Sequence, residues 1–88
     1  MNIEFDSNKN EVNIAKHGIS LADAQNFIWE TATVKIDARF EYGEARYKAQ
    51  GFIGKRLYTL IFTLRDETYR IISLRKSNIK ESKHYEKT

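Results

Sequence analysis

Three apolar-rich segments joined by very short turns occupy residues 44–53, 57–64 and 68–76. Apolar and polar residues alternate along the first and the third segment, which is typical of β-strands, whereas residues 57–64 are apolar enough to indicate burial on both faces. Gly54 and Lys55 suit a two-residue hairpin connection, and three polar residues separate the second segment from the third. Strands joined so tightly pair in antiparallel order. The sequence therefore predicts an antiparallel meander at the centre of the fold.

Helical spacing of apolar residues precedes this meander. Residues 9–17 predict a short helix that is capped by residues 6–8 and closes at Gly18. Its inward-facing residues are expected to be Val12, Ile14 and Ala15. A second helix is predicted from residue 20 to about residue 30, with Ser20 and Asp23 at capping-box spacing. Its apolar stripe comprises Leu21, Ala24, Phe27 and Ile28.

The remaining segments complete a mixed pattern. Residues 2–5 and 34–36 predict short extended stretches, and residues 39–43 predict a polar loop. A C-terminal helix is predicted over residues 77–85, with Ser77 as its cap and Ile79 as its main apolar residue. We therefore expect an α+β domain in which helices pack on a small antiparallel β-sheet. The aromatic residues expected in its core are Phe27, Trp29, Tyr58 and Phe62.

Size and composition narrow the class of protein. The chain is short enough for one domain, predicted over residues 1–88. It has no cysteine, which excludes disulfides, zinc–thiolate sites and cysteine nucleophiles. It shows neither an apolar run of the roughly 20 residues that span a membrane nor the features of a secretory signal. We expect no membrane partner and a cytoplasmic location.

The net charge of +3 results from two halves of opposite sign. Residues 1–45 carry four basic and eight acidic side chains, whereas residues 46–88 carry eleven basic and four acidic ones. Such asymmetry indicates a polyanionic partner such as nucleic acid. The plainer alternative is that the strands and the last helix carry solvated lysines and arginines.

Basic residues cluster along the meander and the helix that follows it. They are Arg46 and Lys48 in its first strand, Arg65, Arg70, Arg75 and Lys76 on or beside its last two strands, and Lys80 in the C-terminal helix. A guanidinium stays charged and binds phosphate through two parallel hydrogen bonds. Several together would bind an RNA backbone and stabilise charge on a scissile phosphate. The alternative is surface ion pairing with Glu44, Glu67 and Glu81. Strict alternation in the last strand places Tyr69, Ile71 and Ser73 on one face and Arg70, Ile72 and Leu74 on the other.

Two further side chains have both a chemical and a structural interpretation. His17 has the chemistry of a general base, but it also stands in the last turn of a helix, where positive charge is favourable. Tyr85 follows Glu81 by one helical turn, and it can stack on a base or anchor the helix to the sheet. His84 is expected to be solvated. The two histidines have no acids at ligand spacing, so neither a metal site nor a cofactor is expected.

The side-chain types that remain suit metal-independent cleavage of RNA. The 2′-hydroxyl of RNA attacks its own phosphate, so the substrate supplies the nucleophile. The protein then needs only a base, charge stabilisation and an acid for the leaving group.

Several short motifs follow one another along nearly the whole chain. They are Phe5-Asp6 with Lys9, Asn13, Lys16-His17-Gly18, Glu44-x-Arg46-Tyr47 with Gly51 and Gly54, Arg70-Ile71-Ile72-Ser73-x-Arg75-Lys76, and finally Glu81 and Tyr85. In this order and at this length they resemble the BrnT toxins of bacterial type II toxin–antitoxin systems. The resemblance implies a RelE-like ribonuclease fold and an endoribonuclease that arrests growth by cutting RNA.

The resemblance also implies partners and site residues. It implies a BrnA-like antitoxin with a ribbon-helix-helix part, and a complex that represses its own operon, so that operator DNA is bound through the antitoxin. The candidate catalytic residues are Glu44, Arg46, Arg70, Arg75, His17 and Tyr85. Glu44 is the first candidate for the general base and His17 the second. The candidate RNA-binding residues are Lys16 and Glu81, which the resemblance implies, together with Lys48, Arg65, Lys76 and Lys80 from the basic residues described above. The alternative is a non-catalytic nucleic-acid-binding or protein-interaction module of the same fold.

Overall fold

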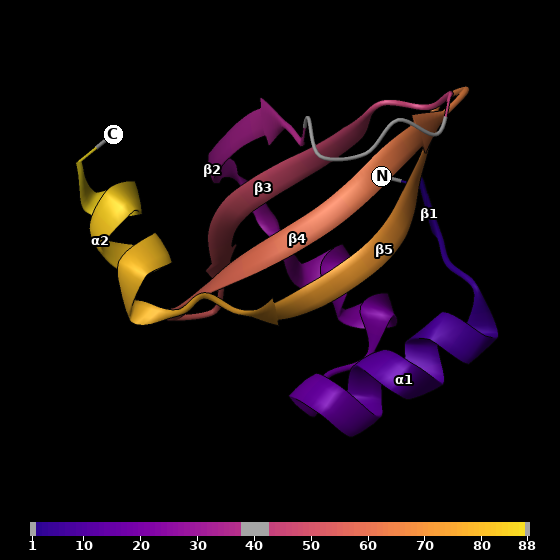
Figure 1. The fold of residues 1–88 in the computed structure, drawn as a ribbon, viewed down its shortest axis with the longest axis horizontal. Coiled ribbons are helices and arrows are strands. Elements are labelled where there is room, and N and C mark those ends of the chain that lie inside the picture. Colours follow the sequence, from indigo (N-terminus) through magenta and orange to yellow (C-terminus); the bar gives the residue numbers. More distant parts are fainter. Residues whose placement is uncertain (1, 38–42, 88) are drawn as a thin grey trace.

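A computed structural model describes residues 2–37 and 43–87 and confirms the α+β class. Figure 1 shows a twisted sheet accompanied by helical segments. The elements in chain order are β1 (Asn2–Glu4), α1 (Ser7–His17), the 3-10 helix η1 (Leu21–Asn26), β2 (Ile28–Ile36), β3 (Arg46–Ile53), β4 (Arg56–Arg65), β5 (Thr68–Lys76) and α2 (Ile79–Glu86). The polar loop predicted at residues 39–43 lies outside the described residues, Gly43 excepted. No helix formed by the described residues has the length and apolar character of a membrane-spanning segment.

The five strands form one sheet in the order β1-β5-β4-β3-β2. Strands β2 to β5 pair in antiparallel order, which confirms the predicted meander. Strand β1, however, pairs in parallel with β5, with Ile3 opposite Tyr69. The sheet is therefore mixed, so the predicted antiparallel sheet is confirmed for β2 to β5 but not for β1. The two strands are far apart in sequence, so no local turn signal could reveal their pairing.

The hydrophobic core lies on one face of the sheet, beneath η1. Its buried members are Leu21, Ala24, Phe27, Ala49, Leu60, Phe62, Ile71 and Leu74. The ring of Trp29 meets that of Phe62 edge-on at a centroid distance of 5.4 Å. Gly51 lies under Phe27, where an added Cβ would stand only 2.7 Å from the ring. The close approach of η1 to the sheet thus depends on glycine at this position.

The second predicted helix is shorter than expected. It is the 3-10 segment η1, and the chain is already extended at Phe27 and enters β2 at Ile28. The Ser20 side chain accepts a hydrogen bond from the backbone N–H of Ala22, so the predicted capping box with Asp23 was wrong. In the strand, Trp29 packs against both Phe27 and Tyr69, at centroid distances of 4.9 and 5.0 Å. These aromatic contacts favour the strand over continued helix.

Helix α1 has the predicted caps but not the predicted inward face. Asp6 caps its first turn, and Gly18 closes it with a φ of 71°. The apolar residues Val12, Ile14 and Ala15 are all exposed, Val12 by 54 %. The helix residue that is buried is instead Asn13, which is 5 % exposed. The expectation of an apolar inward face was therefore wrong, because α1 meets the sheet through amide hydrogen bonds.

The cap of helix α2 lies one residue later than predicted, at Asn78 in place of Ser77. Asn78 and Glu81 form its capping box, whereas the buried Ser77 hydrogen-bonds with the hydroxyl of Thr59 at 2.8 Å. Ile79 is 76 % exposed, so it is not the apolar contact that the sequence predicts. The helix is anchored by Tyr85, whose hydroxyl donates to the carbonyl of Thr31. This side chain therefore has the anchoring role considered from sequence.

Candidate functional site

A β-bulge in β5 decides which side chains share the face opposite the core. The β4–β5 register shifts by one residue, so that Phe62 pairs with Ile71 and Leu60 with Leu74. Ile71 and Leu74 are both buried in the core, and strict alternation from Arg70 to Leu74 was therefore wrong. Without the bulge, two residues five positions apart would point to opposite faces. The bulge places Arg70 and Arg75 on the same face.

The cross-strand register assembles the basic residues into rows on that face. Arg46 and Arg70 flank Thr63 of β4, and Lys48 and Ser73 flank Ile61. Arg75 pairs with Thr59 one row further, and Arg65 stands at the opposite end of β4. Residues paired across strands share a face. We call the set of Arg46, Lys48, Arg65, Arg70 and Arg75 the arginine surface.

Three carboxylates hold members of this surface in place. Glu4 contacts Arg70 at 3.1 Å, and Glu44 receives two hydrogen bonds of 3.0 Å from Arg65. Glu81, at the start of α2, accepts hydrogen bonds of 2.7 and 2.8 Å from the two terminal nitrogens of Arg75. Its second oxygen also lies 3.1 Å from the Lys48 ammonium. The arginine surface is therefore partly neutralised by carboxylates of the same chain.

Two of these carboxylates, Glu81 and Glu44, have a pKa that is lowered from the ordinary value. The hydrogen bonds from Arg75 are the main cause that lowers the pKa of Glu81 to about 2, against the opposing effect of burial. The hydrogen bond from Arg65 is likewise the main cause that lowers the pKa of Glu44. A carboxylate with a lowered pKa is a weaker proton acceptor. The geometry thus favours a structural role for both groups.

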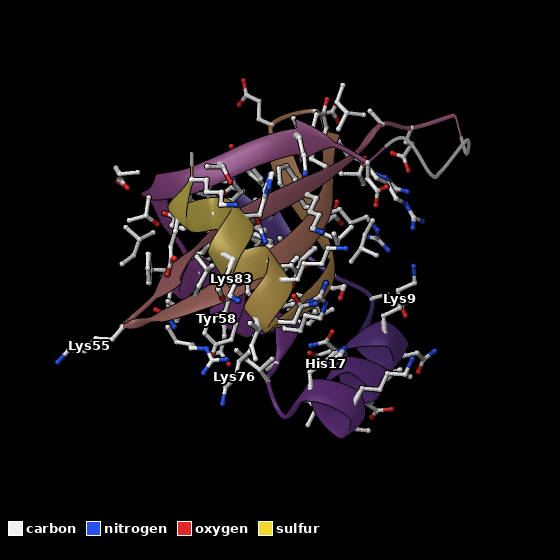
Figure 2. All side chains as sticks on the ribbon, turned by 60° about the vertical axis from the view of Figure 1, so that its left-hand side comes forward. Lys9, His17, Lys55, Tyr58, Lys76 and Lys83 are labelled. Atoms are coloured by element: carbon white, nitrogen blue, oxygen red, sulfur yellow. The ribbon has the colours of Figure 1, made fainter. Side chains whose placement is uncertain are left out.

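His17 and Lys16 lie on α1 and not on the arginine surface itself. They line a pocket of about 340 Å³ next to β5, together with Ile72 and Ser73. Ser73 belongs to the same sheet face as Lys48, so this pocket borders the surface. Figure 2 shows His17 and Lys9 on α1, well separated from Lys83 on α2.

Three other predicted residues are not members of the arginine surface. Lys76 pairs with Tyr58, on the core-facing side of the sheet, although it follows Arg75 directly in sequence. Lys80 is exposed on α2, and it lines a pocket between that helix and β3. The hydroxyl of Tyr85 is engaged with Thr31, and its ring meets Phe52 edge-on.

Sequence reasoning did not single out Lys35 or Glu4. Lys35 of β2 stands opposite Lys48 of β3, and Glu4 of β1 stands opposite Arg70 of β5. The apolar–polar alternation of residues 34–36 indicates on which face of the strand Lys35 lies, but not that it stands opposite Lys48. The position of Glu4 depends on the parallel pairing of β1, for which the sequence has no local signal.

Replacement of Glu81 by glutamine tests the ion-pair arrangement through pH. Because the pKa of Glu81 is lowered to about 2, its stabilisation is full above the ordinary carboxylate pKa and is lost as pH falls toward 2. We expect Glu81→Gln to lower the free energy of unfolding by about 1–3 kcal/mol at pH 7. Thermal denaturation of both proteins between about pH 7 and pH 2.5 should show this difference shrinking below about pH 4.5. A difference that is constant with pH would contradict the ion-pair assignment.

Comparison with known proteins identifies the chain's relatives. A family model described as the ribonuclease toxin BrnT of type II toxin–antitoxin systems matches residues 5–81. Comparison with the curated proteins found no match. The family match covers most of the chain and all five residues of the arginine surface. The chain therefore belongs to the BrnT family of ribonuclease toxins of type II toxin–antitoxin systems.

Proposed function

We propose that this protein is a metal-independent endoribonuclease with a RelE-like fold that cleaves RNA through its own 2′-hydroxyl. The observation that carries the proposal is the arginine surface, where three neighbouring strands of one sheet present guanidinium and ammonium groups on a single face. Arg70 and Arg75 are the groups that we assign to the scissile phosphate. Their charges would stabilise the extra negative charge of the pentacoordinate phosphorane.

The proposed reaction needs one proton acceptor and one proton donor. The 2′-oxygen forms a bond to phosphorus, the bond from phosphorus to the 5′-oxygen breaks, and the products are a 2′,3′-cyclic phosphate and a 5′-hydroxyl. The base takes the proton of the 2′-hydroxyl, and an acid protonates the departing 5′-oxygen. Of the two candidate bases, His17 is favoured, because Glu44 is engaged by Arg65 and its pKa is lowered. An imidazole can both accept and donate a proton.

Incubation of the purified protein with RNA in the presence of EDTA tests this function. We expect cleavage without added metal and products that end in a 2′,3′-cyclic phosphate. A 2′-deoxy substitution at the cleaved nucleotide should abolish cleavage there, because it removes the nucleophile. A requirement for added Mg²⁺, or cleavage of the 2′-deoxy substrate, would contradict the mechanism. The pH–rate profiles of His17→Asn and Glu44→Gln then separate the two candidate bases.

The type II family also supports a proposed protein partner. We assign to it a BrnA-like antitoxin with a ribbon-helix-helix part, through which the complex would bind operator DNA in the cytoplasm. Expression of the toxin alone should arrest growth, and co-expression of the antitoxin should relieve the arrest. Growth that continues normally with active toxin alone would contradict this role.

A further inference from the structure

Two lysines face each other across the β2–β3 pair. Lys35 stands directly opposite Lys48 in the antiparallel register. Like charges in directly opposed positions destabilise a sheet. Lys48 is compensated by Glu81 at 3.1 Å, but Lys35 forms no ion pair with any other described residue. Lys35 is exposed, so its charge is solvated but has no carboxylate partner among the described residues.

Both lysines line a pocket between the sheet and α2. The pocket measures about 370 Å³, and Lys80 and His84 line it from the helix side. A smaller pocket of about 120 Å³ also contains Lys35, Lys48 and His84 in its lining. Gln50, which is 4 % exposed, contributes to both. We call the group of Lys35, Lys48, Lys80 and His84 the lysine pocket.

The charge balance of the lysine pocket favours an anion. The acidic residue that lines the same cavity is Glu81, and the two oxygens of its carboxylate are already engaged by Arg75 and Lys48. Lys80, like Lys35, has no ion pair with another residue in the described part of the chain. An ammonium group on a flexible stem binds a phosphate oxygen as a point charge. A phosphodiester has the size and charge that such a pocket can hold.

We propose that the lysine pocket binds a second phosphate of the RNA strand, next to the one assigned to Arg70 and Arg75. This inference rests on the proposed function, and it extends the RNA path from the arginine surface across β3 to β2 and α2. Glu81 joins the two sites, because Lys48 and Arg75 bind the same carboxylate. The second site holds the strand in register and takes no part in the chemical step.

The test compares two double variants that remove the same number of charges. Lys35→Gln with Lys80→Gln removes the uncompensated lysines of the pocket. Lys55→Gln with Lys83→Gln serves as control, since both of its lysines are exposed and lie outside the pocket. Figure 2 shows Lys55 pointing away from the body of the molecule and Lys83 on α2. A 2′-O-methyl RNA oligonucleotide, which cannot be cleaved, is the probe for binding.

We expect the pocket variant to weaken binding of this probe about tenfold and to reduce its salt dependence. The slope of log K against log salt should fall by about 0.7 for each RNA phosphate that the variant no longer neutralises. The loss should lie mainly in affinity, with a smaller effect on the single-turnover cleavage rate at saturating RNA, which marks a binding role. The two single variants, Lys35→Gln and Lys80→Gln, should each show a part of the effect.

Equal affinity and slope in the pocket and control variants would overturn the proposal. So would a pocket variant that binds RNA normally but loses affinity for the antitoxin, because the pocket would then be a protein-binding site. Failure of the wild-type protein to cleave RNA would instead refute the proposed function. That result is distinguishable, since the binding comparison uses a probe that is not cleaved.

Discussion

The Arg75→Ala variant is expected to cleave RNA about 10²–10³-fold more slowly than the wild-type protein. Arg75 lies on the same sheet face as Arg70 because of the bulge in β5, and Glu81 holds its guanidinium with two hydrogen bonds. Loss of a positioned cation removes stabilisation that develops mainly in the transition state. The decrease should therefore appear in the single-turnover rate at saturating RNA. Arg75→Lys should recover only a part of it, because an ammonium cannot make two parallel hydrogen bonds.

Lys76→Ala is the matched control for this prediction. Lys76 is the next residue in the chain, but it pairs with Tyr58 on the other side of the sheet. The cleavage rate of the Lys76→Ala variant should stay within about twofold of the wild-type rate, because Lys76 lies away from the arginine surface. Similar losses in the two variants would mean that net charge, and not the arginine surface, governs cleavage. A collapse of the melting temperature in Arg75→Ala would mean that the arginine is chiefly structural.

The Asn13→Ala variant is expected to lose about 2–4 kcal/mol of unfolding free energy. The Asn13 amide nitrogen donates to the carbonyls of Leu74 and Ile19 at 2.8 and 2.9 Å, and its oxygen accepts from the N–H of Leu74 at 3.2 Å. Its removal leaves these backbone groups without partners in a buried place. For a domain of this size the melting temperature should fall by roughly 10–20 °C.

Val12→Ala provides the control on the same helix. Val12 is exposed, so thermal denaturation should show a change in unfolding free energy of less than about 0.5 kcal/mol. An apolar inward face for α1 predicts the reverse order, with Val12→Ala the more destabilising change. The two melting temperatures therefore decide whether α1 is attached by apolar packing or by the amide of Asn13.

Much of the fold was predictable because its signals are local. The meander follows from alternation and short turns, and the α1 caps follow from Asp6 and Gly18. Prediction was wrong where a distant contact determines local structure. Trp29 is in a strand because its ring packs against Phe62 and Tyr69, and β1 is parallel because it joins β5.

The candidate site shows the same division. The residue types and the motifs that indicate the BrnT family are present in the sequence, and the family match over residues 5–81 confirms that assignment. The strand register of the structure was needed to show that Lys76 and Arg75 lie on opposite faces of the sheet and that Lys35 stands opposite Lys48. Side chains on one strand can be assigned to faces from sequence only while the alternation is unbroken.

By itself, the sequence determined the meander, the concentration of basic residues in residues 46–88, the absence of cysteine chemistry and the family. Each of these follows from residue type and spacing along the chain. The tertiary structure alone decided which cations share a face, through the bulge at Ile72 and the register of β3, β4 and β5. It also decided that α1 is attached through Asn13, because a hydrogen bond to the backbone of β5 depends on where two distant segments meet.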